Sequence, residues 1–211
     1  MPEQVMVLGA GGHAKVVIDV LRAAGHDVVA VFDDDPARQG QAFRNAPVMG
    51  VTDVAASWAI AAGVSHFIVA IGRNEARLRL GHRLEAAGLR PLAAVHPSAV
   101  LAPSVVVGGG SVVMAGVCIN ADSRLGRHVI VNTGARIDHD CLIGDGAHLA
   151  PGTVLCGNVQ VGELAFLGAG TVVIPGIGMG AGAATGAGSV VVRPVPENKK
   201  VRGVPARPAM E

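Results

Sequence analysis

Aromatic residues are almost absent from this chain. Its 211 residues include no tyrosine, one tryptophan and four phenylalanines, although half of all residues are apolar. The core must therefore be built from valine, alanine, leucine and isoleucine. Glycine is abundant instead, at 30 residues, and it shows no three-residue period, which excludes a collagen helix. A chain rich in valine and glycine and poor in aromatics favours tight turns and stacked β-structure.

A strong charge of either sign is also lacking. The formal net charge is +1, and neither a basic stripe nor an acidic tail is present. Nucleic acid and anionic membranes are therefore not expected as partners. The chain has no run of 18 apolar residues, and the apolar run Val5–Ala10 is too short for a signal peptide or a membrane helix. We expect a cytoplasmic protein with no membrane insertion.

Cysteine is scarce, with three residues at Cys118, Cys141 and Cys156. Their number is odd, and no pair shows the CxxC spacing of redox or zinc sites. They are predicted to be free thiols in a reducing compartment. No metal is expected.

Residues 1–94 alternate strand and helix patterns. Apolar runs that end in a turn residue predict strands at 5–9, 28–32 and 66–71. Helical spacing of apolar residues and helix-end signals predict helices at 13–24, 52–62 and 74–87. The resulting βαβαβ order predicts a small parallel sheet covered by helices, a Rossmann-like α/β domain over 1–94.

From Leu101 the period of the sequence changes to six. Every sixth residue from Leu101 to Val191 is apolar, with Thr185 as the exception, and the register needs no insertion. The fourth residue after each of them is small or β-branched. Three such hexads make one coil of a triangular prism whose apolar positions fill the axis. Because one coil cannot bury its own face, the coils must stack, which predicts an all-β parallel β-helix over 95–211.

Glycine directly follows the apolar residue in seven hexads, at 108, 126, 144, 162, 168, 180 and 186. We expect these glycines to ease the corners of the prism. A prism of this kind can also serve only as a scaffold or an ice-binding surface. An ice-binding face needs rows of exposed threonine, and the repeats show none.

Three motifs, in order, resemble one family. They are Leu8-Gly-Ala-Gly-Gly-His-Ala-Lys15 after a strand, Ile137-Asp-His-Asp-Cys-Leu-Ile-Gly144 within the repeats, and Val201-Arg-Gly-Val-Pro-Ala-Arg207 near the end. The chain is similar over nearly its whole length to bacterial sugar-nucleotide acetyltransferases of the PglD/NeuD type. The resemblance implies a left-handed prism and a homotrimer with its active site between adjacent prisms. It also implies acetyl-CoA-dependent acetylation of the amino group of a UDP- or GDP-linked 4-amino-sugar.

Acetyl transfer from a thioester to an amine needs a base for the proton of the amine and donors that stabilise the oxyanion. His139 suits the base, because histidine titrates near neutral pH and this one stands at the third position of its hexad, where a side chain can leave the prism. Asp140 or Asp138 can orient the imidazole. In the family the acidic residue after the histidine has this role, so the resemblance favours Asp140. A solvated polar corner is the alternative interpretation.

The resemblance also implies how acetyl-CoA binds. The resemblance places Gly157 near the thioester and His148 near the acetyl carbonyl. The alternative interpretation of His148 is an outward-facing surface residue. Backbone contacts along the pantetheine are expected from two pairs, Gly168-Ala169 and Gly186-Ala187. Basic residues near the C-terminus suit the CoA phosphates, unless they form only a solvated tail: Lys199, Lys200, Arg202 and Arg207.

The loop at residues 9–13 follows a strand and opens a helix, where backbone N–H groups can face phosphate. It departs from the G-x-G-x-x-G dinucleotide fingerprint, so NAD(P)H is not expected. By resemblance this loop holds the nucleotide-sugar through Gly11, Gly12, His13 and Lys15.

Two further pairs of residues are expected at the same edge of the sheet. Asp33 and Asp34 follow the second strand, where a carboxylate can accept hydrogen bonds from a base or ribose, or merely form a turn. Gly72 and Arg73 end the third strand and are expected to line the same pocket. These residues do not decide between UDP and GDP.

Three other functions stay open. A sialic-acid-type sugar O-acetyltransferase differs only in its nucleophile. A non-catalytic partner in a sugar-biosynthesis complex would not need His139 for activity. A sugar-nucleotide reductase would need NAD(P)H and a second, substrate-reducing domain.

Overall fold

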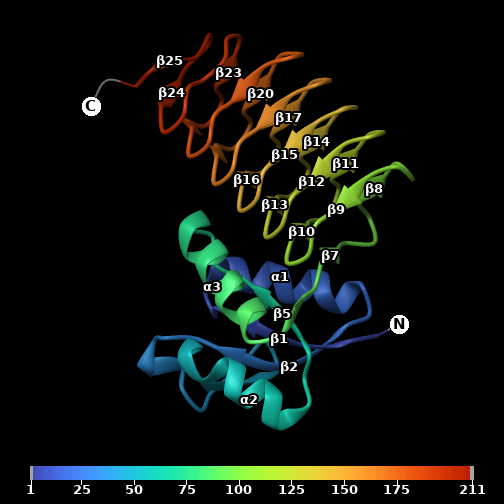
Figure 1. The fold of residues 1–211 in the computed structure, drawn as a ribbon, viewed down its shortest axis with the longest axis vertical. Coiled ribbons are helices and arrows are strands. Elements are labelled where there is room, and N and C mark those ends of the chain that lie inside the picture. The colour runs from blue at the N-terminus through green and yellow to red at the C-terminus, as the bar shows by residue number, and fades with distance from the viewer. Residues whose placement is uncertain (1, 210–211) are drawn as a thin grey trace. The chain divides into compact units, whose positions relative to one another are not determined.

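The computed structural model describes residues 2–209, and the chain divides into two compact units, Met1–Pro97 and Ser98–Glu211. Figure 1 labels their helices and strands. Within the described residues, no helix is both long and apolar enough to cross a membrane. The same residues contain no group of three or more histidine, cysteine, aspartate or glutamate side chains that is placed to hold a metal ion, and the three cysteines are free.

The first unit is built on a six-stranded sheet in the order β3-β4-β2-β1-β5-β6. β1 pairs in parallel with β2 and β5, as the βαβαβ pattern predicts. β3 and β4 form a hairpin beyond β2, in a segment whose pattern predicted no strand. The strands of this sheet are β1 (Gln4–Leu8), β2 (Asp27–Phe32), β3 (Ala42–Phe43), β4 (Ala46–Gly50), β5 (His66–Val69) and β6 (Arg90–Pro91). A further short strand, β7 (Ala94–Val95), lies outside this sheet.

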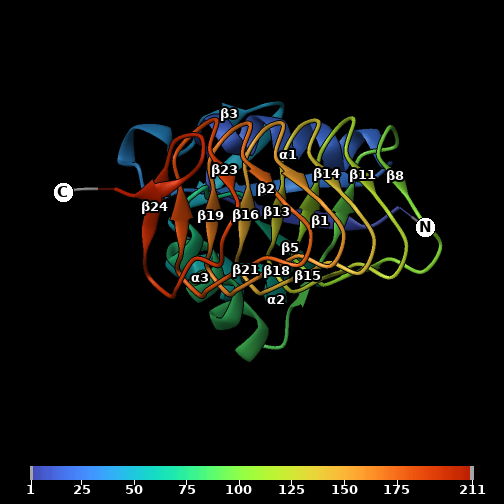
Figure 2. The ribbon, with the colours of Figure 1, turned by 90° about the horizontal axis from the view of Figure 1, so that it is seen from above.

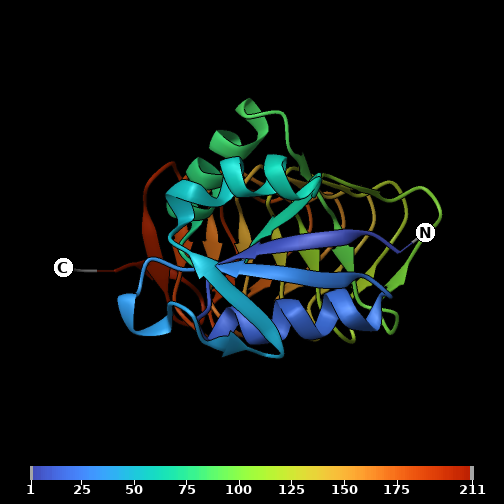
Figure 3. The same cartoon turned by 90° about the horizontal axis from the view of Figure 1, so that it is seen from below.

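Helices cover both faces of this sheet. α1 (Gly12–Ala23) lies on one face, and α2 (Ala55–Ala62) and α3 (Asn74–Ala86) lie on the other (Figure 3). Because β1, β2 and β5 are parallel, their carboxyl ends meet at one edge, which is where ligands of open α/β sheets bind. Short 3₁₀ turns follow β2 and β4, at Pro36–Arg38 and Thr52–Val54. The core under α2 and α3 includes Met6, Leu8, Phe32, Phe67 and Leu84.

The second unit is a prism of stacked coils with three faces. Each coil contributes one short strand to each face, and successive coils pair in parallel, so that Ile119 pairs with Ile137 and Ile137 with Leu155. Three hexads therefore complete one coil, as the six-residue period predicts. The rows of strand labels in Figure 2 follow the three faces.

The strands of the prism group by face. The first face contains β8 (Val100–Leu101), β11 (Cys118–Ile119), β14 (Arg136–Ile137), β17 (Val154–Leu155), β20 (Val172–Val173) and β23 (Val190–Val191). The second face contains β9 (Val106–Val107), β12 (Arg124–Leu125), β15 (Leu142–Ile143), β18 (Gln160–Val161) and β21 (Gly178–Met179). The third face contains β10 (Val112–Val113), β13 (Ile130–Val131), β16 (His148–Leu149), β19 (Phe166–Leu167), β22 (Ala184–Thr185), β24 (Lys200–Arg202) and, antiparallel to it, β25 (Arg207–Pro208).

The apolar position of each hexad points into the prism. Every residue of this series from Val113 to Val191 is buried. Thr185, the polar member of the series, is satisfied inside the prism, because its hydroxyl accepts from Gly168 N–H at 2.9 Å and lies 2.7 Å from the hydroxyl of Thr171. The core is therefore aliphatic, as the lack of aromatics requires.

The glycines that follow the apolar residues act at the corners of the prism through close packing. They do not carry the left-handed backbone of the corners, which falls two residues later, for example at Gly146 with φ 64°. Instead they let neighbouring coils approach each other. A Cβ at Gly144 would lie 2.6 Å from the backbone nitrogen of Glu163 on the next coil. These glycines therefore ease the corners by allowing close packing between coils, which excludes a side chain.

Gly144→Ala is expected to destabilise the prism by about 1–3 kcal/mol, because the added Cβ would overlap backbone that cannot move without disturbing the stacked coils. The loss is measured as a lower midpoint of urea or thermal unfolding. Gly178→Ala is the matched control, because a Cβ at Gly178 meets nothing within 4 Å and its φ lies outside the left-handed region. An equal loss in both variants would contradict the close-approach explanation.

Candidate active site

His139 and Asp140 lie at the corner where the chain passes from the first face to the second, between β14 and β15. Asp140 occupies the left-handed turn with φ 60°, a conformation that aspartate tolerates better than most residues other than glycine. Its carboxylate contacts the neighbouring imidazole, with Nδ1 of His139 2.7 Å from Oδ2 of Asp140. Because an ionised carboxylate only accepts hydrogen bonds, Nδ1 carries the proton, and Nε2 is left to accept another.

Asp138 holds the backbone of this corner rather than the imidazole. Its Oδ1 accepts hydrogen bonds from the N–H of His139 and from Nδ2 of Asn120, both at 2.9 Å. Asn120 stands at the equivalent corner position of the preceding coil. Its hydrogen bond to Asp138 therefore joins two successive coils beneath the histidine. Of the two carboxylates considered from the sequence, Asp140 is the one that contacts the ring. Asn120 was not predicted from the sequence, where its only signal is its place three hexads before Asp138.

The carboxylates around His139 raise its pKa. The hydrogen bond to Asp140 has the largest effect, and the negative charge of Asp138 adds to it, because both favour the imidazolium form. The hydrogen bond from Asn120 in turn lowers the pKa of Asp138, which keeps that carboxylate charged. A raised pKa makes the neutral imidazole a stronger base, which suits proton transfer from an amine.

Gly157 lies against the imidazole, at the same corner of the next coil. A Cβ at this position would lie 2.6 Å from both Cε1 and Nε2 of His139, so only glycine leaves room for the ring in this orientation. Gly157 is buried, and no hydrogen bond from its N–H is present within residues 2–209. The corner therefore combines a proton acceptor with a backbone donor that has no partner there.

His148 lies on a different part of the coil. It belongs to β16 on the third face, where its buried ring packs edge-on against Phe166 with 5.2 Å between the ring centroids. Its Nε2 lies 3.3 Å from Nδ2 of Asn132. Within one chain, the structure does not bring His148 to the corner that holds His139.

The two pairs expected along the pantetheine stack on one another. Gly168-Ala169 and Gly186-Ala187 occupy successive coils at the corner between the third face and the first. A Cβ at Gly168 would lie 2.8 Å from the nitrogen of Ala187, so the coils touch here through backbone alone. The residues expected to bind acetyl-CoA are therefore spread over two corners and the third face.

Basic residues near the C-terminus border a pocket of about 940 Å³ at the end of the prism. Arg202 lies in β24 but outside this lining. Arg193 was not predicted from the sequence, because it lies before the basic cluster that begins at Lys199. The cations of the lining are Arg193, Lys199, Lys200 and Arg207.

Parallel pairing aligns part of this basic cluster with the third face. His148 pairs with Phe166, Phe166 with Ala184, and Ala184 with Lys200, so the four form one column across successive coils. A ligand that followed this column would have a histidine at one end and a cation at the other.

The loop after β1 leaves open space at two of its glycines. A Cβ at Gly11 or Gly12 meets nothing within 4 Å, and neither backbone is left-handed. By contrast, Gly9 has φ +107°, and a Cβ there would lie 3.0 Å from the carbonyl oxygen of Ala70, so the fold itself requires this glycine. α1 begins at Gly12 with no acidic side chain in its first turn, and Lys15 is exposed. Space, a helix N-terminus and a cation together suit a phosphate group.

His13 is neutral at ordinary pH. Burial and the charge of Arg77 lower its pKa to about 4. Arg77 is itself buried and donates hydrogen bonds to the backbone oxygens of Ile71 and Gly72, at 3.0 and 3.1 Å. It therefore fixes the loop after β5. Arg77 was not predicted from the sequence, because an arginine within a helix is expected to face solvent.

Asp33 and Asp34 both have structural partners. Asp33 accepts hydrogen bonds from the N–H groups of Ala10 and Asp35, which joins the loops after β1 and β2. Asp34 accepts from the N–H of Thr52 at 2.8 Å and from its hydroxyl at 3.2 Å. Both aspartates therefore form turns, as considered from the sequence. Their hydrogen bonds hold the two carboxylates at the edge where β1 and β2 end.

Asp34 and Arg73 also line a pocket of about 420 Å³ at this edge. Gly72 precedes Arg73, and a Cβ there would meet nothing within 4 Å. Arg79 and Arg83 of α3 were not predicted from the sequence, although a spacing of four residues places them on one helix face. The remaining lining residues are Thr52, Asp53, Ile71, Ala76, Arg79, Leu80 and Arg83.

Both units match known families. Residues 4–84 match the model of the PglD N-terminal domain, and residues 140–175 match the model of the bacterial transferase hexapeptide, six repeats. A mutant of perosamine N-acetyltransferase from Caulobacter crescentus, solved with CoA and GDP-perosamine, is 48% identical to this chain. The match covers 99% of this chain and 97% of that chain, with a TM-score of 0.94.

Two further structures are also similar over nearly the full length. The acetyltransferase domain of PglB from Neisseria gonorrhoeae, solved with acetyl coenzyme A, is 36% identical over 99% of this chain and 100% of that chain, with a TM-score of 0.92. WeeI from Acinetobacter baumannii is 26% identical over 98% and 100%, with a TM-score of 0.84. These matches confirm the resemblance and the predicted fold, an α/β domain followed by a left-handed parallel β-helix.

Asp140→Asn is expected to lower the pKa of His139 toward the ordinary histidine value, because an amide cannot stabilise the imidazolium as a carboxylate does. The pKa is measured from the imidazole Cε1–H resonance of His139 in an NMR titration. Asp122→Asn is the matched control, because Asp122 has the same left-handed turn position one coil earlier, with φ 62°. An unchanged pKa in Asp140→Asn would rule out the pairing as the cause of the shift.

Proposed function

The chain belongs to the PglD-type family of bacterial sugar-nucleotide acetyltransferases, and we propose that it transfers an acetyl group from acetyl-CoA to the amino group of a GDP-linked 4-amino-sugar. It is an acyltransferase, like its relatives. The 48% identical relative was solved with GDP-perosamine, which favours GDP over UDP. One observation carries the proposed chemistry: the His139–Asp140 pair at 2.7 Å, with the ring against Gly157.

His139 is the general base of the proposed reaction. The neutral amine of the sugar attacks the thioester carbonyl carbon, a C–N bond forms, and Nε2 of His139 takes a proton from the nitrogen. Asp140 accepts the hydrogen bond from Nδ1–H and stabilises the imidazolium that results. When the tetrahedral intermediate collapses, the C–S bond breaks and the imidazolium returns the proton to the leaving thiolate of CoA.

Gly157 is the proposed oxyanion donor. Within residues 2–209 its N–H makes no hydrogen bond, and the residue contacts the ring of His139. A donor fixed by stacked coils needs no reorganisation when charge develops on the carbonyl oxygen. Asp138 and Asn120 are positioning residues in this proposal, because they hold the backbone N–H of His139 rather than any reacting atom.

The proposed cofactor site joins two copies of the chain. The column from His148 to Lys200 and the pairs Gly168-Ala169 and Gly186-Ala187 stand apart from the corner of His139. A homotrimer would let CoA lie in the groove between adjacent prisms, with His139 from one copy and the column from the next. His148 then faces the acetyl group, and the phosphates lie near the cations Lys199, Lys200 and Arg202.

The nucleotide-sugar is proposed to bind at the carboxyl edge of the first unit. Its diphosphate lies at the N-terminus of α1, where Gly11 and Gly12 leave space, neutral His13 can donate a hydrogen bond, and Lys15 supplies charge. Asp33 and Asp34 lie where a ribose follows the diphosphate, and Gly72 and Arg73 border the same edge.

We place the enzyme in the cytoplasm. Acetyl-CoA and nucleotide-sugars are supplied there, and the three free cysteines fit a reducing compartment.

The substrate proposal is tested by thiol release from acetyl-CoA with a panel of acceptors. We expect turnover with a GDP-linked 4-amino-sugar and much less with its UDP-linked counterpart. A GDP-sugar with a hydroxyl in place of the amine is the matched control and should give none. Turnover of a hydroxyl acceptor such as sialic acid, with none for any amino-sugar nucleotide, would contradict the proposal and favour a sugar O-acetyltransferase.

His139→Asn is expected to lower kcat by at least about 100-fold, because the base is lost. Gly157→Ala should cause a similar fall, because its Cβ would displace the ring of His139, and a shift of about 1 Å at a reacting group costs about 100-fold. Both are measured by thiol release, with Gly178→Ala as the glycine control. Full activity in His139→Asn would contradict a catalytic role and favour a non-catalytic partner protein.

A further inference from the structure

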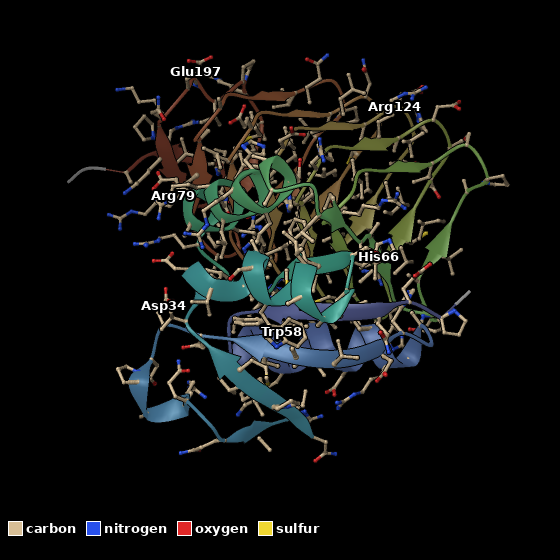
Figure 4. All side chains as sticks on the ribbon, turned by 60° about the horizontal axis from the view of Figure 1, so that its bottom comes forward. Asp34, Trp58, His66, Arg79, Arg124 and Glu197 are labelled. Carbon is tan, nitrogen blue, oxygen red and sulfur yellow. The ribbon has the colours of Figure 1, made fainter. Side chains whose placement is uncertain are left out.

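The pocket of about 420 Å³ in the first unit contributes only Asp34 and Arg73 of its lining to the proposed function. It lies where the parallel strands end, and its lining comes from the end of β2, the turn after β4, the loop after β5 and one side of α3. Figure 4 labels two of the lining residues, Asp34 at the end of β2 and Arg79 on α3. Its volume is in the range of small-molecule sites.

The carboxylates of this pocket already have partners. Asp34 accepts two hydrogen bonds from Thr52. Asp53 is paired with Arg83, which also donates from Nη2 to the carbonyl oxygen of Thr52 at 2.9 Å. These contacts engage the acidic side chains and one of the arginines with the protein itself.

The other two arginines are available to a ligand. Among residues 2–209, the guanidinium groups of Arg73 and Arg79 form no hydrogen bond or ion pair. The rest of the lining includes the apolar side chains of Ile71, Ala76 and Leu80. A flat apolar group with hydrogen-bond acceptors on its edge fits these walls, and a nucleobase is such a group.

The pocket is also in the right place for a base. The hydrogen bond from Ala10 N–H to Asp33 joins the loop after β1 to the end of β2, directly before Asp34. In open α/β sheets a nucleotide lies across the carboxyl ends of the strands, with its diphosphate at the glycine-rich loop. A diphosphate at Gly11 and Gly12 then directs the nucleoside toward this pocket.

We propose that this pocket binds the guanine base of the nucleotide-sugar and that Arg79 recognises its O6 and N7 atoms. This inference rests on the proposed function, from which it takes the nucleotide. Guanine presents two adjacent acceptors, which match the paired N–H groups of an arginine. Adenine replaces one of them with an amino donor, and uracil separates its two carbonyl oxygens by an N–H group. Arg79 therefore selects GDP over UDP, and Arg73 adds positive charge beside it.

Isothermal titration of GDP, UDP and inorganic pyrophosphate into the full chain tests this assignment. We expect the wild-type protein to bind GDP more tightly than UDP. Arg79→Ala should weaken GDP binding by about tenfold or more and leave UDP and pyrophosphate within about twofold. Arg79→Lys should not restore GDP binding, because a lysine is a point charge and cannot contact both acceptors as a planar fork does.

Arg90→Ala is the matched control. Arg90 is exposed and pairs with His66 at the amino end of β5, the opposite edge of the same sheet, so all three affinities should stay unchanged. Equal affinity of the wild-type protein for GDP and UDP would overturn the inference. An equal loss of affinity for all three ligands in Arg79→Ala would also overturn it, and so would full GDP affinity in Arg79→Lys. Either result would indicate that Arg79 contacts a phosphate.

These titrations need no turnover, so the two proposals can fail separately. A protein that binds GDP through Arg79 but releases no thiol with any amino-sugar nucleotide would keep the base pocket and contradict the proposed reaction. The converse result is acetylation of a GDP-linked sugar by the protein while Arg79→Ala leaves its GDP affinity unchanged. That result would support the proposed reaction and contradict the base pocket. Circular dichroism of each variant confirms that the fold is intact.

Discussion

Backbone pairing between successive coils is the constraint on which the rest of the prism depends. The pairing register of three hexads per coil cannot shift by one residue, because such a shift would expose the buried aliphatic residues to solvent. Each corner of a coil therefore meets the same corner of the next. Asn120 reaches Asp138 in this way, and His139 meets Gly157. The candidate catalytic corner is thus a product of the repeat, with no loop or insertion of its own.

The side chain of His139 is both exposed and held in a fixed orientation at this corner. The ring of His139 is more than half exposed, yet Asp140 holds its Nδ1, Asp138 holds its backbone N–H, and Gly157 limits its motion from the next coil. The left-handed turn at Asp140, which most hexads give to glycine, brings the carboxylate onto the ring. A base that is accessible to substrate and already oriented needs little reorganisation in the transition state.

The sequence predicted those features that repeat or are local. The hexads predicted the buried rows because each residue of a series has the same surroundings, and the adjacent pair His139–Asp140 was found because its contact is local. Contacts between distant segments were missed, as with Asn120 and Arg77, since nothing in a linear pattern links them to their partners. The turn partners of Asp34 and the pocket beside it were likewise hidden, because α3 and the end of β2 meet only in the folded sheet.

The site of the acetyl group in the product tests the proposed reaction most directly. The protein is incubated with acetyl-CoA and a GDP-linked 4-amino-sugar, and the nucleotide-sugar is analysed by mass spectrometry and proton NMR. We predict the gain of one acetyl group on the 4-amino nitrogen, as an amide that resists hydroxylamine. An acetyl ester on a hydroxyl group, or an unchanged nucleotide-sugar, would contradict the assignment of this protein as a sugar-nucleotide N-acetyltransferase.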